Sequence, residues 1–126
     1  MAKIIYKKES YEIIGCCYEV FNTLGPGLRE STYQKALAEI LKQKQKNFKS
    51  QVRVSLKINN KVFDTYILDF LIDNAIAVEL KVGDHFFRRD IEQIFSYLKS
   101  MKLKLGLLIN FTSKGVRFKR IINLNK

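Results

Sequence analysis

The stretch Leu68–Val82 reads LDFLIDNAIAVELKV, and its pattern decides the fold. Two apolar segments flank Asp73-Asn74, which is a typical turn signal, so the stretch is predicted to form a β-hairpin. Each segment carries charge where a buried strand should have none: Asp69 interrupts the first, and Glu79 and Lys81 interrupt the second. Because burial of an unpaired carboxylate costs several kcal/mol, these charges require a partner.

The geometry of such a hairpin brings the charges together. If the turn is centred near Asn74, residues whose numbers sum to about 148 face each other, so Asp69 lies opposite Glu79 at a Cβ separation of roughly 5 Å. Lys81 then lies on the same face as Glu79, because side chains alternate along a strand. Two carboxylates this close repel, so one should bind a proton or a cation. Oxygen ligands suit a hard ion such as Mg²⁺ or Mn²⁺.

Other interpretations of these charges remain open. Asp69 and Glu79 are also compatible with a structural network that includes Lys81 or an arginine, or with strand ends that lie in water. A shift of one residue in the register would separate the pair. In that case Asp73 or Asp84 would be the alternative ligand.

Composition predicts one folded domain that covers residues 1–126, because the apolar content of 47% can build a core. No apolar run approaches the length of a membrane span, and the N-terminus lacks the pattern of a signal peptide. A cytoplasmic location without membrane contact is therefore expected. Cys16 and Cys17 are neighbours in a helical pattern and are expected to be buried free thiols.

The charge distribution predicts a polyanionic partner. The net charge is +11, and the segment from residue 93 to the end carries eight basic residues and no acid. Such an excess attracts nucleic acid, and the binding should depend on salt. The alternative is a lysine-rich solvated surface. An anionic membrane is disfavoured, because no helix combines a basic face with a bare apolar one.

Hydrophobic periodicity predicts three helices and five strands. We expect helices from the N-cap Ser10 to about Leu24, at about 29–46 and at about 88–101. Strands are expected at about 51–58, 61–72, 76–82, 105–109 and 116–122. The order α-α-β-β-β-α-β-β predicts an α/β (α+β) fold, in which a mixed β-sheet is flanked by helices.

Three further motifs accompany the charged hairpin: GLREST followed by Tyr at residues 27–33, QIFSYL at 93–98 and LLINF at 107–111. In this order, and with Asp69, Glu79 and Lys81 on the second and third strands, they resemble the PD-(D/E)XK nuclease superfamily and, within it, the GxxExxY family. The resemblance extends from about residue 13 to 121. It implies a restriction-endonuclease-like core.

The resemblance also implies roles for the charged hairpin. Asp69 and Glu79 would hold Mg²⁺ (or Mn²⁺) with help from the backbone carbonyl of Leu80. Lys81 would position or activate the attacking water and stabilise charge on the phosphate.

Two helices would contribute the remaining catalytic residues, again by resemblance. Glu30 corresponds to an acid near the metal, Gln93 to a polar residue beside it, and Tyr97 would support the site or contact the substrate. Each residue also has a simpler explanation. Glu30 favours the dipole at the start of its helix, Gln93 is a surface amide, and Tyr97 is a core aromatic with a wet hydroxyl.

Three functions remain compatible with the sequence. The first is a Mg²⁺-dependent nuclease that acts on DNA or RNA. The second is a catalytically silent nucleic-acid-binding module with a nuclease-like fold. The third is a structural or partner-binding domain, for which a homodimer is the simplest form.

Overall fold

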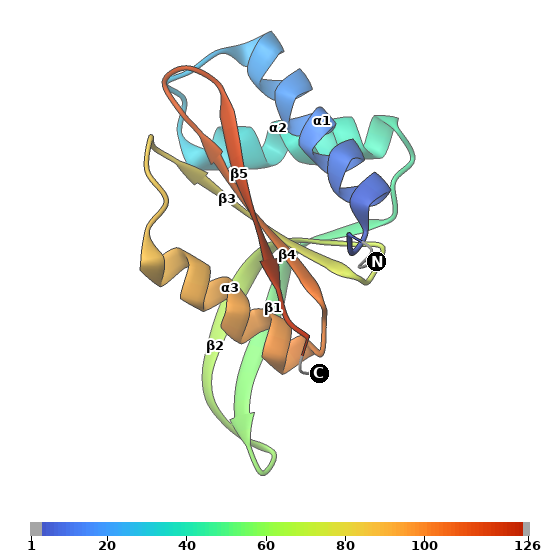
Figure 1. Ribbon diagram of the computed structural model, residues 1–126, viewed down its shortest axis with the longest axis vertical. Coiled ribbons are helices and arrows are strands. Elements are labelled where there is room, and N and C mark those ends of the chain that lie inside the picture. The colour runs from blue at the N-terminus through green and yellow to red at the C-terminus, as the bar shows by residue number, and fades with distance from the viewer. Residues whose placement is uncertain (1–3, 125–126) are drawn as a thin grey trace.

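The computed structural model describes residues 4–124, which form three helices and five strands (Figure 1). The elements are α1 (Lys7–Leu24), α2 (Glu30–Gln43), β1 (Phe48–Ile58), β2 (Lys61–Ile72), β3 (Ile76–Val82), α3 (Arg88–Met101), β4 (Leu105–Phe111) and β5 (Val116–Ile122). The predicted element order is confirmed. No helix in this part of the chain is long and apolar enough to cross a membrane.

The sheet is mixed, as predicted, and its strands follow the order β1-β2-β3-β4-β5. Only the central pair, β3 and β4, is parallel; the other pairs are antiparallel. A parallel pair needs a long crossover connection, and α3 supplies it. The β2–β3 hairpin, which carries Asp69, Glu79 and Lys81, therefore has the antiparallel strand β1 on one side and the parallel strand β4 on the other.

Alternate residues of the central strands pack against different helices. Leu107 and Ile109 of β4 belong to a core that also contains Leu37 of α2 and Val20 of α1. Leu108, between them in the sequence, packs with α3 in a second core. Both faces of the central strands are therefore covered, which explains why β4 is buried along its whole length.

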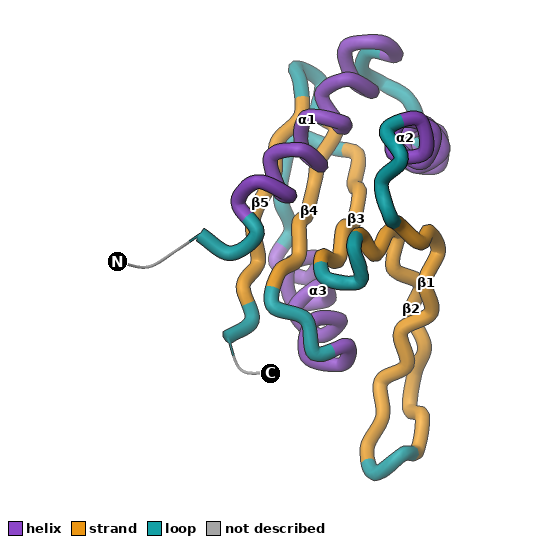
Figure 2. Tube along the Cα trace, turned by 90° about the vertical axis from the view of Figure 1, so that its right-hand side faces the viewer, coloured by secondary structure: helices purple, strands orange, loops and turns teal. Residues whose placement is uncertain are grey.

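β2 changes face at Asp69. Leu68 packs in the core beneath α3, whereas Phe70, two residues later, packs in the core beneath α1 and α2. Residues two apart normally share a face, so the strand is kinked here. Across from it, Gln51 of β1 has a left-handed φ of 54°. Beyond the kink, β1 and β2 extend as a hairpin well past the rest of the sheet (Figure 2), and β1 contacts α3.

The boundaries differ from the prediction at the ends of two helices. Ser10 does not cap α1, which begins at Lys7; its buried hydroxyl instead donates a hydrogen bond of 2.7 Å to the Tyr6 carbonyl. The 3.6-residue pattern cannot distinguish a cap from a buried serine in the first turn. α2 ends at Gln43, and β1 starts early because Phe48 pairs with Ile72.

Two predictions about small features are confirmed. Cys16 and Cys17 are buried and unbonded to each other. Both hairpin turns use left-handed residues: Asn59 and Asn60 have φ values of 49° and 68°, and Asp73 and Asn74 have values of 56° and 51°. Turns of this kind match the twist of the strands that they connect.

Candidate active site

The site lies where the β2–β3 ladder stops. Phe70 pairs with Val78 in the predicted register, but the next residues, Asp69 and Glu79, bond through side chains. The Asp69 N–H donates to Glu79 Oε1 at 3.0 Å, and the Leu80 N–H donates to Asp69 Oδ2 at 2.8 Å. Each carboxylate thus accepts a backbone hydrogen bond from the opposite strand, which holds both acids in a fixed orientation.

Burial makes this carboxylate pair electrostatically unfavourable. Asp69 is 5% exposed and Glu79 is 6% exposed. Burial, with a smaller contribution from Asp69, raises the pKa of Glu79 to about 8. Burial also raises the pKa of Asp69, although the Leu80 N–H and Gln34 oppose the change. At neutral pH, without a cation, Glu79 therefore retains a proton.

Lys81 connects the pair to α3. Its Nζ lies 3.9 Å from Glu79 Oε2 and 3.9 Å from Asp90 Oδ1. Both distances are at the outer limit of an ion pair, and the lysine side chain is 29% exposed, so its ammonium group remains accessible at the mouth of the site. Asp90 was not predicted. It lies in the first turn of α3, three residues before Gln93, and this position is the sequence signal that could have identified it.

Gln34 connects the pair to α2. Its Nε2 donates to Asp69 Oδ1 at 2.9 Å and to Glu30 Oε2 at 3.3 Å. Glu30 therefore joins the site through Gln34, and burial raises its pKa while Lys81 opposes the change. Sequence reasoning missed Gln34. Its position four residues after Glu30, on the same helix face, is the signal that could have identified it.

Tyr97 lies beneath the site and Gln93 lies beside it. Tyr97 is 1% exposed, and its ring centroid is 6.0 Å from that of Tyr66. Burial and the nearby Glu79 and Asp69 raise its pKa, so the phenol stays protonated. Gln93 lines a cavity of about 440 Å³ next to Asp90. Within residues 4–124 no hydrogen bond joins its amide to either carboxylate of the pair.

The alternative ligands do not join the site. The Asp84 carboxylate accepts hydrogen bonds from the N–H and hydroxyl of Ser113, and Asp73 lies in the hairpin turn. Tyr33 is a core aromatic that stacks on Phe111 at 4.1 Å and donates its hydroxyl hydrogen bond to the Gly25 carbonyl. Asp84 and Tyr33 therefore have structural partners of their own.

The donor set fits a hard cation with few protein ligands. Among the described residues, no group of three or more His, Cys, Asp or Glu side chains is arranged to hold a metal. Two carboxylates nevertheless match the usual habit of Mg²⁺, which binds one or two carboxylates and completes its shell with water and substrate phosphate. The pair Asp69–Glu79 supplies that minimum.

Comparisons with known proteins agree with this arrangement. The model of the PD-(D/E)XK nuclease superfamily matches residues 7–121. The chain belongs to this superfamily. No curated protein matches the sequence.

A solved structure supports the fold. The crystal structure of SSO0001 matches with a TM-score of 0.61 at 20% sequence identity, over 96% of this chain and 61% of that one. This chain therefore spans less than two thirds of the length of SSO0001. At this identity the likeness shows the fold alone.

Proposed function

We propose that the protein is a Mg²⁺- or Mn²⁺-dependent nuclease of the GxxExxY type that hydrolyses phosphodiester bonds in DNA or RNA. The observation that carries the proposal is the buried Asp69–Glu79 pair, with the Lys81 ammonium 3.9 Å from Glu79. Two buried acids beside one lysine are costly for stability alone. Membership of a nuclease superfamily supports a catalytic use of the carboxylate pair, which would explain why this cost in stability is tolerated.

The carboxylate pair would hold the cation. Asp69 and Glu79, with the Leu80 carbonyl as the expected third ligand, would bind Mg²⁺ through oxygen atoms. A divalent ion bound there lowers the pKa of its water and offsets charge on the phosphate. Gln34 and the Leu80 N–H already fix both Asp69 oxygens, so little reorganisation is needed when the ion binds.

Lys81 would act on the substrate. Its ammonium lies between Glu79 and Asp90, where it can orient the attacking water and stabilise the charge that develops on the phosphate. Glu30 would act on the carboxylate pair indirectly, through the hydrogen bond that it accepts from Gln34. Tyr97 would pack beneath the site as a neutral phenol, and Gln93 would contact the substrate from α3.

Cleavage assays on a plasmid and on a single-stranded oligonucleotide test this function. The wild type should cut in Mg²⁺ or Mn²⁺ and not in EDTA, and Lys81→Ala should slow cleavage by about 100-fold or more, as loss of a charge-stabilising group does. Asp84→Asn is the matched control, because it changes an acid that bonds to Ser113 instead. Equal rates for wild type and Lys81→Ala would refute the catalytic role.

One observation favours a second candidate, a nucleic-acid-binding module without catalysis. The Gln34 amide and the Leu80 N–H satisfy both oxygens of Asp69 without any cation, and burial raises the pKa of Glu79, which favours its neutral form. Such a module would bind nucleic acid in EDTA and would keep its affinity in Asp69→Ala.

Three expectations from the sequence stay predictions: the single domain over residues 1–126, the cytoplasmic location and the homodimer. Residues 1–3 and 125–126 lie outside the described residues.

A further inference from the structure

A groove follows α3 on the side of the β1–β2 hairpin. Its first part is the cavity of about 440 Å³ beside Asp90 and Gln93, and its second part is a hollow of about 710 Å³ that reaches Met101. Leu56 and Ser96 line both parts, so the two are direct neighbours along α3. The groove therefore begins at Asp90, which contacts Lys81 of the site, and leads away along α3.

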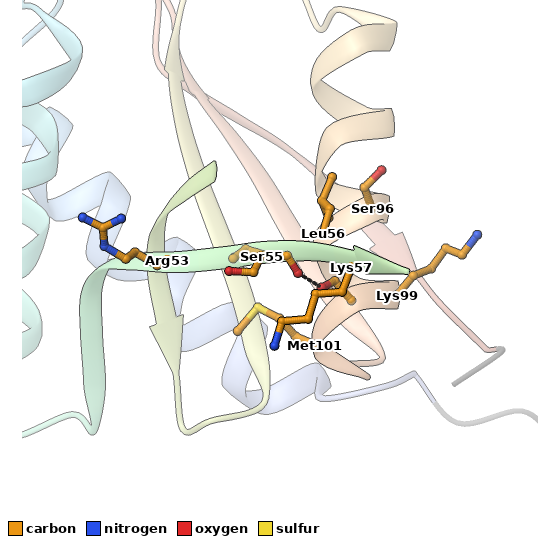
Figure 3. A pocket seen from close by; sticks show the side chains of 9 residues that line it. Arg53, Ser55, Leu56, Lys57, Ser96, Lys99 and Met101 are labelled. Atoms are coloured by element: carbon orange, nitrogen blue, oxygen red, sulfur yellow. Dashed lines mark hydrogen bonds between the residues drawn. The ribbon is translucent and has the colours of Figure 1, made fainter. Parts of the chain in front are cut away.

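Figure 3 shows the second part from close by. Its labelled side chains come from the edge strand β1 and from α3, and Arg53 lies at the opposite end from Lys99. The hydroxyl of Ser100 donates a hydrogen bond of 2.9 Å to the Ser55 carbonyl. This bond joins β1 to α3, the two elements that line the hollow.

The charge of the lining changes along the groove. The part next to the site contains Asp90 and Glu92 together with Arg89. The far part contains Arg53, Lys57 and Lys99 and no acid. All three of these basic side chains are exposed, and within residues 4–124 none of them forms an ion pair. Lys99 Nζ lies over the Phe95 ring at 5.8 Å, but no carboxylate of the described residues neutralises any of the three charges, so each of them can bind an anion.

The shape and charge select one kind of polyanion. Basic side chains that contact the backbone, together with an aromatic side chain on which a base can stack, are the usual way to bind a single strand of nucleic acid. Here the basic side chains line the far part, and Tyr66 lines the part next to the site. The base of an unpaired nucleotide can stack on Tyr66, whereas the bases of a duplex are already stacked on one another. From Asp90 to Met101, α3 rises by about 16 Å, which matches about five stacked nucleotides.

We propose that this groove binds a single strand of nucleic acid and leads it to the Asp69–Glu79 pair. The phosphates contact Arg53, Lys57 and Lys99, and the strand passes Gln93 before it reaches Lys81. This proposal rests on the nuclease function proposed above, but it concerns binding, and binding can be measured without cleavage.

Fluorescence anisotropy in EDTA measures that binding, with a labelled oligothymidylate of about twelve nucleotides as the probe. The groove variant combines Arg53→Gln, Lys57→Gln and Lys99→Gln. Its dissociation constant should rise by about tenfold or more, and the salt dependence of log K should flatten by about 2, because each lost phosphate contact removes about 0.7 from the slope for a single strand.

The matched control removes the same charge elsewhere. It combines Lys7→Gln, Lys8→Gln and Lys42→Gln, all exposed residues on α1 and α2. The control should bind within about twofold of the wild type and keep its salt slope. A duplex of the same length should bind all three proteins weakly and equally. Circular dichroism melting checks that each variant is folded.

The outcomes separate the groove from the nuclease. Equal weakening by both triple variants, an unaffected groove variant, or no binding by the wild type would overturn the groove. If the protein cuts with Mg²⁺ but the groove variant binds normally, the proposed nuclease function stands and the proposed groove is wrong. If the protein never cuts but only the groove variant loses affinity, the proposed groove stands and the proposed nuclease function is wrong.

Discussion

The two halves of the β2–β3 hairpin are held together by different forces. Next to the turn, Leu71 pairs with Ala77 and Ile72 pairs with Ile76 in a regular ladder of buried apolar residues. One residue past Phe70, the ladder gives way to the two carboxylate-to-backbone bonds of Asp69 and Glu79. Continuous apolar burial supports the first half. In the second half each acid accepts the backbone N–H of the opposite strand, and the outer sides of the two strands pair with β1 and β4.

This contrast teaches how a domain can carry a charged site inside its core. The ladder half contributes stability and leaves the chemistry untouched. The carboxylate half weakens the fold, since burial raises the pKa of Glu79 to about 8, but it places two acids, an amide and a lysine together. Variants in the two halves should therefore separate stability from activity.

The largest effect is expected in the ladder half. Ile72→Ala removes a side chain that is 1% exposed, and the resulting cavity should lower the free energy of unfolding by about 2–5 kcal/mol. Cleavage per folded molecule should not change. Urea denaturation and nicking assays well below the melting temperature measure the two quantities.

The matched variant in the other half is Asp69→Asn. Its amide oxygen can still accept the Leu80 N–H, but its NH2 group faces the Gln34 amide, which must turn to accept from it. Stability should therefore change by no more than about 1 kcal/mol while cleavage is lost. A folded Ile72→Ala protein without activity would contradict the separation of the two halves.

The second effect is a pH dependence that belongs to the carboxylate half. The pKa of Glu79 rises from 4.5 to about 8 on folding, so between these values the folded state holds a proton that the unfolded state has lost. Stability in EDTA should therefore fall as pH rises, by about 2 kcal/mol between about pH 6 and pH 7.5.

Glu79→Gln isolates this contribution, because glutamine does not titrate. As pH rises through that range, the unfolding free energy of the wild type should fall steadily relative to that of Glu79→Gln. A constant difference, or a wild type that gains stability with pH relative to the variant, would mean that Glu79 is already ionised in the folded protein.

The third effect is stabilisation by the cation. A ligand present at ten times its dissociation constant stabilises the folded state by about 1.4 kcal/mol, so Mg²⁺ should raise the melting temperature of the wild type. Asp69→Asn should respond little, and Asp84→Asn should respond like the wild type. An equal response from Asp69→Asn would place the ion elsewhere on the protein.

The hairpin also shows how far sequence reasoning extends. The register followed from the turn at Asp73-Asn74 and from alternation along the strands, both of which are local signals. Gln34 and Asp90 were missed because helical periodicity gives the face of a residue but not its distant partner. The kink at Asp69 lies opposite Gln51, which has a left-handed φ, and glutamine carries no local signal for that conformation.

The smallest effect returns to the turn that sets the register. Asn74 has a φ of 51°, which glycine adopts without steric cost, although glycine also gains freedom in the unfolded chain. Asn74→Gly should therefore change stability by no more than about 0.5 kcal/mol. Because the ladder holds Asp69 opposite Glu79, cleavage and the Mg²⁺ response should match the wild type. Loss of the Mg²⁺ response in a stable Asn74→Gly protein would mean that the turn, rather than the paired apolar residues, sets the spacing of the two carboxylates.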